Sequence, residues 1–260
     1  MLYTVEGLVI SRRDIGESSC FLDVLTDEMG LLEVSARGVK KVSAKNHAAY
    51  SIFSYCTFCV NKTKNNYTLN SVEPKYLFHG LSNDICAFSL ANYFCDVMKY
   101  CASSEEQQPN LLRLMLISLY RLEGYASHGE EYTILNKLKS VFELRLMAQI
   151  GFMPELRVCG FCGRGLDENL RFYPILGLVG CNDCNVKNNN DSIGISSSVF
   201  KAMRHIVYSD IEKIFSFSLN KENFIKLQNV CEMYLLNQVG RSFKTLDYYK
   251  NMYYKGMRND

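Results

Sequence analysis

Residues 5–37, VEGLVISRRDIGESSCFLDVLTDEMGLLEVSAR, decide the class of fold that this chain adopts. They contain three short apolar runs, at 5–10, 20–26 and 31–37, and the segments between them are rich in glycine and acidic residues, as turns are. In the third run apolar and polar residues alternate, a pattern typical of a strand with one buried face. The stretch therefore predicts three β-strands joined by turns.

Two further strands are expected at 50–60 and 67–72, connected by a turn at Asn65 and Asn66. A polar stretch that contains several lysines separates them from the first three strands. Five short strands within about 75 residues, with one long connection between the third and the fourth, are typical of a small closed barrel. An SH3-like barrel and an OB barrel both fit this pattern.

From Leu81 onward the hydrophobic periodicity is that of helices. Helices are expected at 84–101, 111–122, 135–150, 196–208 and 224–240. Serines at the start of the fourth can cap it, and Gly151 and Gly240 can end the third and the fifth. The sequence thus predicts an α+β multidomain protein, with a barrel over residues 1–79 and a helical domain over 80–260.

The composition is that of an ordinary globular protein: 22% of the 260 residues are charged and 48% belong to the hydrophobic class. These values exclude wholesale disorder and a fibrous repeat. The net charge of +2 excludes a polycationic nucleic-acid coat, although a balanced total can hide a local basic patch. The first twenty residues carry five charges, and the apolar run at 111–122 is too short to span a bilayer, so we expect a soluble cytoplasmic protein.

Four of the eleven cysteines form two Cys-x2-Cys pairs separated by eighteen residues: Cys159, Cys162, Cys181 and Cys184. This spacing predicts a tetrahedral thiolate site, because two residues between thiolates in a turn allow both sulfurs to face one ion. Zinc suits four thiolates, and an iron–sulfur cluster could use the same number of ligands. Four protein ligands leave no open coordination position, so we expect one structural Zn²⁺ per chain, held in an insertion at 155–188.

The remaining cysteines mostly stand alone in apolar runs, which fits buried thiols in a reducing compartment. Cys56 and Cys59 also form a Cys-x2-Cys pair, but they lie in an expected strand, where residues three apart point to opposite faces. Neither a second pair nor a nearby histidine accompanies them in the sequence. Two packed thiols are therefore expected here, and not a metal or redox site.

Six cations of the barrel are expected to gather over one surface and to contact nucleic acid: Arg12, Arg13, Arg37, Lys40, Lys41 and Lys45. The first two end the first strand, and the other four fall in a stretch, 37–45, that holds no acidic residue. A run of charged residues is often only a solvent-exposed face. Residues 1–79 carry nine Lys/Arg against eight Asp/Glu, so a basic patch on the barrel requires that these charges be unevenly distributed over its surface. The aromatic residues that could stack on bases are assigned mainly to the core: Tyr50, Phe53, Tyr55, Phe58 and Tyr67.

The sequence contains no recognisable catalytic constellation. Its four histidines are isolated, and the spacings of phosphate-binding glycine loops are missing. A metal-dependent hydrolase or deaminase would need an open ligand position and a glutamate base beside its ligands, which the four-cysteine set lacks. We therefore expect a protein that is not an enzyme. A protein-interaction scaffold, or an RNA-binding factor of translation or ribosome assembly, could also combine such a barrel with a zinc ribbon.

Three strings of the sequence, taken together, resemble the RecO family of bacterial recombination mediators. They are GLVISRRDIGESSCFLDVLTDEMGLLEVSARGVKK at 7–41, FELRLMAQIGFMPELRVCGFCG at 142–163 and GRSFKTLDYY at 240–249. They occur in the order expected for the family, whereas residues 80–135 show little similarity at the level of motifs. Some relatives lack the cysteines, and this chain keeps all four.

The resemblance implies an N-terminal OB fold, and a helical C-terminal domain that carries a zinc-finger insertion. It also implies a non-enzymatic DNA-repair protein, associated with the nucleoid, that binds single- and double-stranded DNA and anneals complementary strands. The implied partners are RecR, with which it loads RecA, and the acidic C-terminal tail of single-strand-binding protein. By motif, SRRDIGES brings Arg12 and Arg13, and ARGVKK brings Arg37, Lys40 and Lys41, as the DNA-facing cations. Lys45 belongs to the loop that follows.

Overall fold

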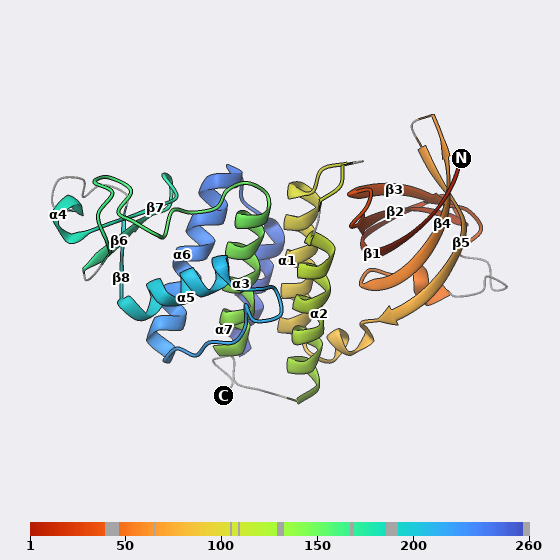
Figure 1. The fold of residues 1–260 in the computed structure, drawn as a ribbon. Coiled ribbons are helices and arrows are strands. Elements are labelled where there is room, and N and C mark those ends of the chain that lie inside the picture. The colour runs from red at the N-terminus through yellow and green to blue at the C-terminus, as the bar shows by residue number, and fades with distance from the viewer. Residues whose placement is uncertain are drawn as a thin grey trace. The chain divides into compact units, whose positions relative to one another are not determined.

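The computed structural model describes residues 1–39, 47–64, 66–104, 106–108, 110–128, 133–166, 169–185 and 192–256. The chain divides into two compact units. Unit 1 comprises Met1–Gly129 and Phe243–Asp260, and unit 2 comprises Glu130–Ser242. The predicted boundary after residue 79 follows the last strand of the barrel, whereas the compact units divide after Gly129 and after Ser242. Figure 1 traces the chain through both units.

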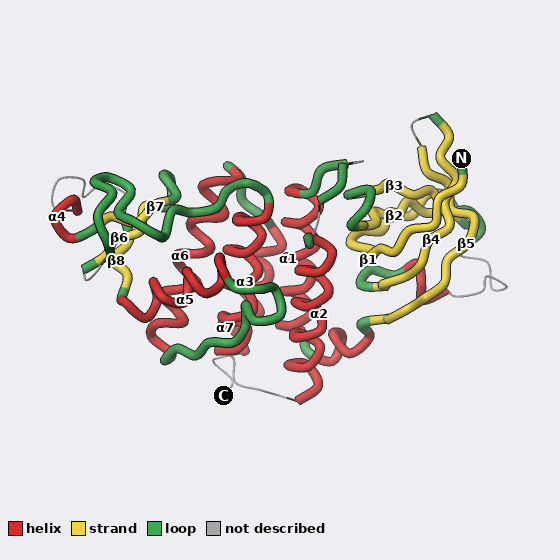
Figure 2. The backbone as a smooth tube through the Cα atoms, viewed as in Figure 1, coloured by secondary structure: helices red, strands yellow, loops and turns green. Residues whose placement is uncertain are grey.

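Within its described residues, unit 1 contains five strands, two short 3-10 helices and three α-helices. They are β1 (Leu2–Ile15), β2 (Ser19–Thr26), β3 (Leu31–Ala36), η1 (His47–Tyr50), β4 (Ser54–Thr63), β5 (Asn66–Leu77), η2 (His79–Asn83), α1 (Ile85–Cys101), α2 (Leu111–His128) and α7 (Lys244–Gly256). Unit 2 contains α3 (Thr133–Gln149), β6 (Leu170–Tyr173), β7 (Leu178–Gly180), α4 (Asn182–Asn185), β8 (Ile193–Ile195), α5 (Ser197–Tyr208) and α6 (Lys221–Val239). Figure 2 separates strands from helices by colour.

The first five strands close into a barrel in the order β1-β2-β3-β5-β4, with β4 returning to β1. All neighbours are antiparallel except β3 and β5, which pair in parallel over Val34–Tyr67 and Ser35–Thr68. The barrel is therefore OB-like, and the predicted fold class, a barrel followed by a helical region, is confirmed. β1 is long enough to pair with both β2 and β4, and it changes register between Val9 and Ser11.

Alternation along the strands fills the barrel interior. The inward residues form one buried apolar cluster: Val5, Val9, Cys20, Leu22, Val24, Leu32, Val34, Ala36, Cys56, Phe58, Val60, Tyr67 and Val72 among others. Two of the predicted core aromatics, Phe58 and Tyr67, belong to this cluster, and Tyr50 packs against it. Tyr55 instead lies on the outer side of β4, where its hydroxyl donates to the carboxylate of Glu6.

Helix ends follow the capping residues that the sequence offers. Ser196 accepts a hydrogen bond from the backbone N–H of Val199 and starts α5, as predicted. Gly240, with φ 69°, ends α6 in the left-handed region that glycine adopts without strain. In unit 1, the carboxylate of Asp84 accepts from the backbone N–H of Ala87 and starts α1.

Helix α7 and the three-stranded sheet of unit 2 were not predicted, and neither were the short helices η1, η2 and α4. Helix α7 buries residues at helical spacing, and two of them are the tyrosines Tyr249 and Tyr253. Because lysines and an asparagine surround these tyrosines, the mean hydropathy of the segment is low and its buried face is not recognised from the sequence. The sheet β7-β6-β8 consists of strands of three or four residues, too short for an alternating pattern to be recognised.

A buried ion network lies in the core of unit 2. The Nζ of Lys139, on α3, is 2.7 Å from a carboxylate oxygen of Glu143 and 2.8 Å from one of Glu232 on α6. Burial alone would lower the pKa of Lys139, but the two carboxylates outweigh it and raise the pKa above its ordinary value. The side chain of Lys139 is fully buried, so this charge depends on its partners.

Candidate metal centre and nucleic-acid interface

Two turns present the four predicted cysteine ligands. In the first, Gly163 adopts a φ of 71° and its N–H donates to the carbonyl of Cys159, 2.8 Å away, which closes the turn around Cys162. The second begins immediately after β7, where the N–H of Cys184 donates to the carbonyl of Cys181 at 3.1 Å. The N–H of Gly160 donates to the carbonyl of Val179 in β7, so the first turn lies beside the strand that leads into the second.

The four sulfurs converge on one point. All four Sγ atoms lie within 4.8 Å of one another, and the Sγ atoms of Cys162 and Cys181 are 3.8 Å apart. A tetrahedron of thiolates about 2.3 Å from a zinc ion has edges of about 3.8 Å, whereas a disulfide would bring two sulfurs to about 2.05 Å. The structure thus brings together the cysteines that the spacing singled out, in an arrangement that could hold a metal ion.

The close packing of the four cysteines shifts the pKa values of two of the thiols, those of Cys159 and Cys184. Burial raises the pKa of Cys159, but backbone N–H groups of Cys181, Phe161 and Cys162 outweigh it and lower the pKa to about 6. Burial and hydrogen bonds with the other three cysteines raise the pKa of Cys184 to about 12. A cation at the centre favours the thiolate form of every ligand, so the donor set fits a metal that prefers sulfur. Four sulfur ligands leave no position for a reacting water.

The second Cys-x2-Cys pair behaves as predicted. Cys56 is fully buried in the barrel, and burial raises the pKa of its thiol to about 11. Cys59 lies on the opposite side of β4, half-buried, with the amide of Asn70 3.7 Å from its sulfur. A strand places residues three apart on opposite faces, so the two thiols cannot share an ion.

The two neighbouring arginines of β1 point to opposite sides of the barrel wall. Arg12 pairs in register with Leu22, an interior residue; its Nε is 2.9 Å from the carboxylate of Asp14, and its Nη1 donates to the carbonyl of Tyr50 at 3.3 Å. Arg13 pairs with Phe21 on the outer face and is three times as exposed as Arg12, at 63% against 21%. The structure therefore does not bring the two guanidinium groups together.

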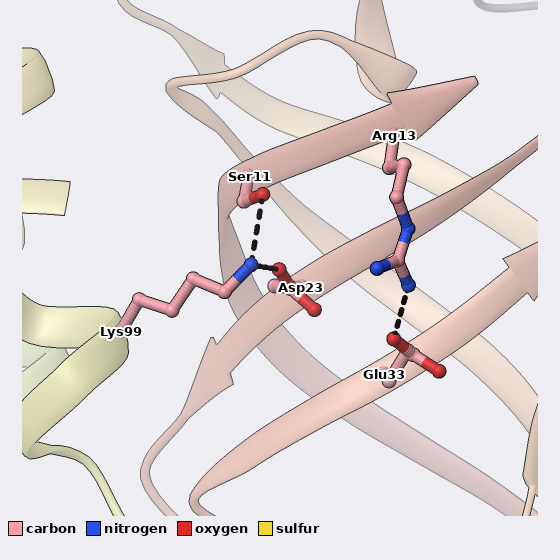
Figure 3. A network of polar contacts seen from close by, with 5 residues as sticks. All are labelled: Ser11, Arg13, Asp23, Glu33 and Lys99. Carbon is pink, nitrogen blue, oxygen red and sulfur yellow. Dashed lines mark hydrogen bonds and ion pairs between the residues drawn. The ribbon is translucent and has the colours of Figure 1, made fainter. Parts of the chain in front are cut away.

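Arg13 belongs to a charged array on the outer face of β1, β2 and β3 (Figure 3). Its Nη2 is 2.6 Å from a carboxylate oxygen of Glu33. On the same face, the Nζ of Lys99, from α1, is 2.5 Å from a carboxylate oxygen of Asp23 and 3.4 Å from the hydroxyl of Ser11. The figure shows Lys99 reaching the sheet from the helix, and Arg13 and Glu33 facing one another across β2.

Arg37 is exposed and lies one residue beyond β3. It follows Ser35, an outward residue that pairs with Phe21, by two positions. The other three predicted cations, Lys40, Lys41 and Lys45, lie outside the described residues.

One residue of this face was not singled out from the sequence. Phe21 stands on the outer side of β2, half-buried, with the guanidinium carbon of Arg13 5.4 Å from its ring centroid. The signal was available, because Phe21 alternates with the interior residues Cys20 and Leu22 and so occupies a position on the solvent side of the strand.

Among the helices of the described residues, none has the length and the apolar character required to cross a membrane.

Comparison with known proteins covers both parts of the chain. The family model described as "Recombination protein O N terminal" matches residues 1–78, and "Recombination protein O C terminal" matches residues 82–247. Among curated proteins, the "DNA repair protein RecO" of Alkaliphilus metalliredigens (strain QYMF) is 28% identical over 97% of this chain and 100% of its own length. The protein of the same name from Acetivibrio thermocellus is 25% identical over 95% of each chain. That of Symbiobacterium thermophilum is 27% identical over 95% of this chain and 96% of its own. With a closed OB-like barrel, a helical region and matches along almost the whole sequence, the chain belongs to the RecO family.

Proposed function

We propose that this protein is a mediator of DNA repair and homologous recombination that performs no chemistry of its own. It binds single- and double-stranded DNA, anneals complementary strands, and helps to load RecA onto DNA that is coated with single-strand-binding protein. RecR and the acidic C-terminal tail of single-strand-binding protein are its proposed protein partners. Membership of the RecO family supports each of these assignments.

The single observation that carries the DNA-binding part of the proposal is the outer face of β1, β2 and β3. Arg13 lies on the outer side of an OB-like sheet, Arg37 follows β3 directly and is exposed, and the sequence continues from Arg37 into a stretch with three lysines and no acidic residue up to Lys45. Guanidinium and ammonium groups bind phosphates without reading bases. Arg12 points to the other side of the barrel wall, where it is held by Asp14 and the carbonyl of Tyr50, and is proposed to bind DNA separately at the rim of the barrel.

Annealing requires no bond to be made or broken. Two single strands repel one another through their phosphates, and a cationic surface that holds one strand lowers this repulsion. Contacts confined to the backbone leave the base edges free, so the strands can slide until they are in register. Such a surface should bind with strong salt dependence and little sequence preference.

The cysteine cluster is proposed to hold one Zn²⁺ with a structural role. The ligands would be Cys159, Cys162, Cys181 and Cys184, whose sulfurs lie within 4.8 Å of one another. Zinc is favoured over an iron–sulfur cluster because the spacing of 3.8 Å between two of the sulfurs matches the edge of a ZnS₄ tetrahedron. When bound, the ion would neutralise the thiolates and join the two cysteine turns.

The experiment that tests the proposal is annealing of two complementary oligonucleotides that are already coated with single-strand-binding protein. The wild-type chain should accelerate annealing, and a variant with Arg37, Lys40 and Lys41 reversed to glutamate should bind DNA more weakly at every salt concentration. Equal affinity of the wild type and the triple variant across a salt titration would remove this barrel surface from the proposal.

Two alternatives are distinguished by binding to naked single-stranded DNA and by comparing the annealing of RNA with that of DNA. A pure protein-interaction scaffold would not bind naked single-stranded DNA at moderate salt. An RNA-binding factor would anneal RNA strands more efficiently than DNA strands of the same sequence. Neither alternative accounts for the matches of both family models.

A further inference from the structure

The outer face of β1, β2 and β3 is divided into a covered half and an open half. In the covered half, Leu8 and Leu25 are neighbours on the sheet and are fully buried, and both α1 and α2 pack against β1. The ion pair between Lys99 of α1 and Asp23 marks the edge of this cover. Beyond it, toward the β1–β2 turn, Arg13 is 63% exposed and Ile15 is 44% exposed.

Phe21 is the large aromatic residue of the open half. Its cross-strand neighbours are Arg13 on β1 and Ser35 on β3. The guanidinium of Arg13 lies over the ring at 5.4 Å, whereas serine is too small to cover an aromatic ring from the other side. A phenylalanine in a barrel strand usually points into the interior. Here Phe58 and Tyr67 belong to the interior cluster, and Phe21 does not.

We propose that Phe21 is a base-stacking platform for single-stranded nucleic acid, and that Arg13 binds the phosphate beside the stacked base. The inference rests on the proposed function and names the form of substrate that this face selects. A base offers a π-face whatever its identity, so stacking on Phe21 adds affinity without sequence preference. In a duplex the faces of the bases are hidden by their neighbours, so the same ring cannot stack on double-stranded DNA.

The arrangement of charge agrees with this role. A strand whose base rests on Phe21 carries its backbone past the guanidinium of Arg13, and the exposed Arg37 follows Ser35, the neighbour of Phe21 on β3, by two positions. OB barrels commonly use this face, formed by strands 2 and 3, for single strands. The cation–π contact between Arg13 and Phe21 would serve in the unbound protein to hold both groups toward solvent.

The chain contains no tryptophan, which allows a direct test. Phe21→Trp would place a single fluorophore at the proposed platform, and Tyr120→Trp would place one at a 65% exposed position on α2 of the same compact unit. Titration with oligothymidylate should quench the fluorescence of F21W along the binding isotherm and leave that of Y120W unchanged. An abasic strand of equal length should bind without quenching F21W.

A second pair of variants covers the case in which tryptophan disturbs the strand. Phe21→Leu keeps an apolar side chain without a π-face, and Phe21→Tyr keeps the ring. We expect F21L to lose roughly ten-fold in affinity for oligothymidylate and little for duplex DNA, and F21Y to bind as the wild type does. Tyr120→Leu, the matched control, should bind both as the wild type does.

The outcomes separate the two proposals. If labelled oligonucleotides bind to the wild type, but F21W is not quenched and F21L binds single strands normally, the stacking role is wrong and the DNA-binding proposal stands. If F21L loses single- and double-stranded affinity equally, Phe21 supports the surface without stacking, and the inference is likewise overturned. If the wild type binds no nucleic acid in low salt, both proposals fail.

Discussion

Replacing Glu33 with glutamine should strengthen DNA binding. The carboxylate of Glu33 is 2.6 Å from Nη2 of Arg13, so it competes with a phosphate for this guanidinium. Both side chains are more than half exposed, and such a surface ion pair contributes about 0.2–1 kcal/mol. Repulsion between the carboxylate and a phosphate about 7 Å away adds about 0.2–0.6 kcal/mol after screening.

The two contributions together predict a gain of about two- to fifteen-fold in affinity for Glu33→Gln. The assay is fluorescence anisotropy of a labelled oligothymidylate, titrated with protein at several salt concentrations. The gain should shrink as salt is added, because screening weakens both the ion pair and the repulsion.

The matched control is Glu6→Gln. Glu6, on β1, is also half exposed, but it pairs with Lys75 on the β1–β4–β5 side of the barrel, so the substitution changes the net charge equally at a different place. If E33Q and E6Q increase the affinity by the same factor, the gain reflects overall charge, and the assignment of Arg13 to the DNA-binding surface is refuted.

Three further predictions concern stability and cysteine chemistry. Lys139→Met should destabilise unit 2 by about 3–5 kcal/mol, because it leaves two glutamates facing each other in the core, whereas Lys226→Met, which breaks an exposed pair on α6, should cost less than about 0.5 kcal/mol. In Lys139→Met the two buried carboxylates have raised pKa values in the folded state. The loss in free energy of unfolding, measured by urea denaturation, should therefore decrease as the pH is lowered from about 7.5 to about 5. A loss that is constant with pH contradicts this reasoning. Metal chelation or Cys162→Ser should open the cysteine turns to limited proteolysis and leave the barrel resistant, and full protection of both in chelator would count against a structural metal. At about pH 8 an alkylating reagent should modify Cys59 well before Cys56, whose buried thiol has a pKa of about 11. The reverse order, read by mass spectrometry, would contradict the burial of Cys56 in the barrel interior.

The parts of the fold that were predicted are those in which the determining information is local. Alternation in residues 31–37 marks β3, and Gly240 marks the end of α6, because each depends on neighbours within one turn or one strand. The cysteine cluster was predictable for the same reason, since each Cys-x2-Cys turn presents its own two sulfurs. Helix α7 was missed because the residues that it buries include tyrosines, which carry a polar hydroxyl and do not mark a clear apolar stripe.

The candidate DNA-binding face shows where prediction from the sequence ends. Arg12 and Arg13 are adjacent in the chain, and a count of charges treats them alike, but the pleat of β1 sends one to the rim of the barrel and the other to its outer face. Phe21 was overlooked because an apolar residue in a strand is usually buried. Its accessibility depends on α1 and α2 covering only part of the sheet.

The sequence by itself determined the strands of a small barrel, most of the longer helices and the four cysteines of the candidate metal site, because periodicity and short spacings are properties of consecutive residues. Only the tertiary structure decided which cations share a surface, that Glu33 competes for Arg13, and that Phe21 remains accessible. These facts depend on strand register and on the packing of helices from distant parts of the chain, and no local pattern encodes either.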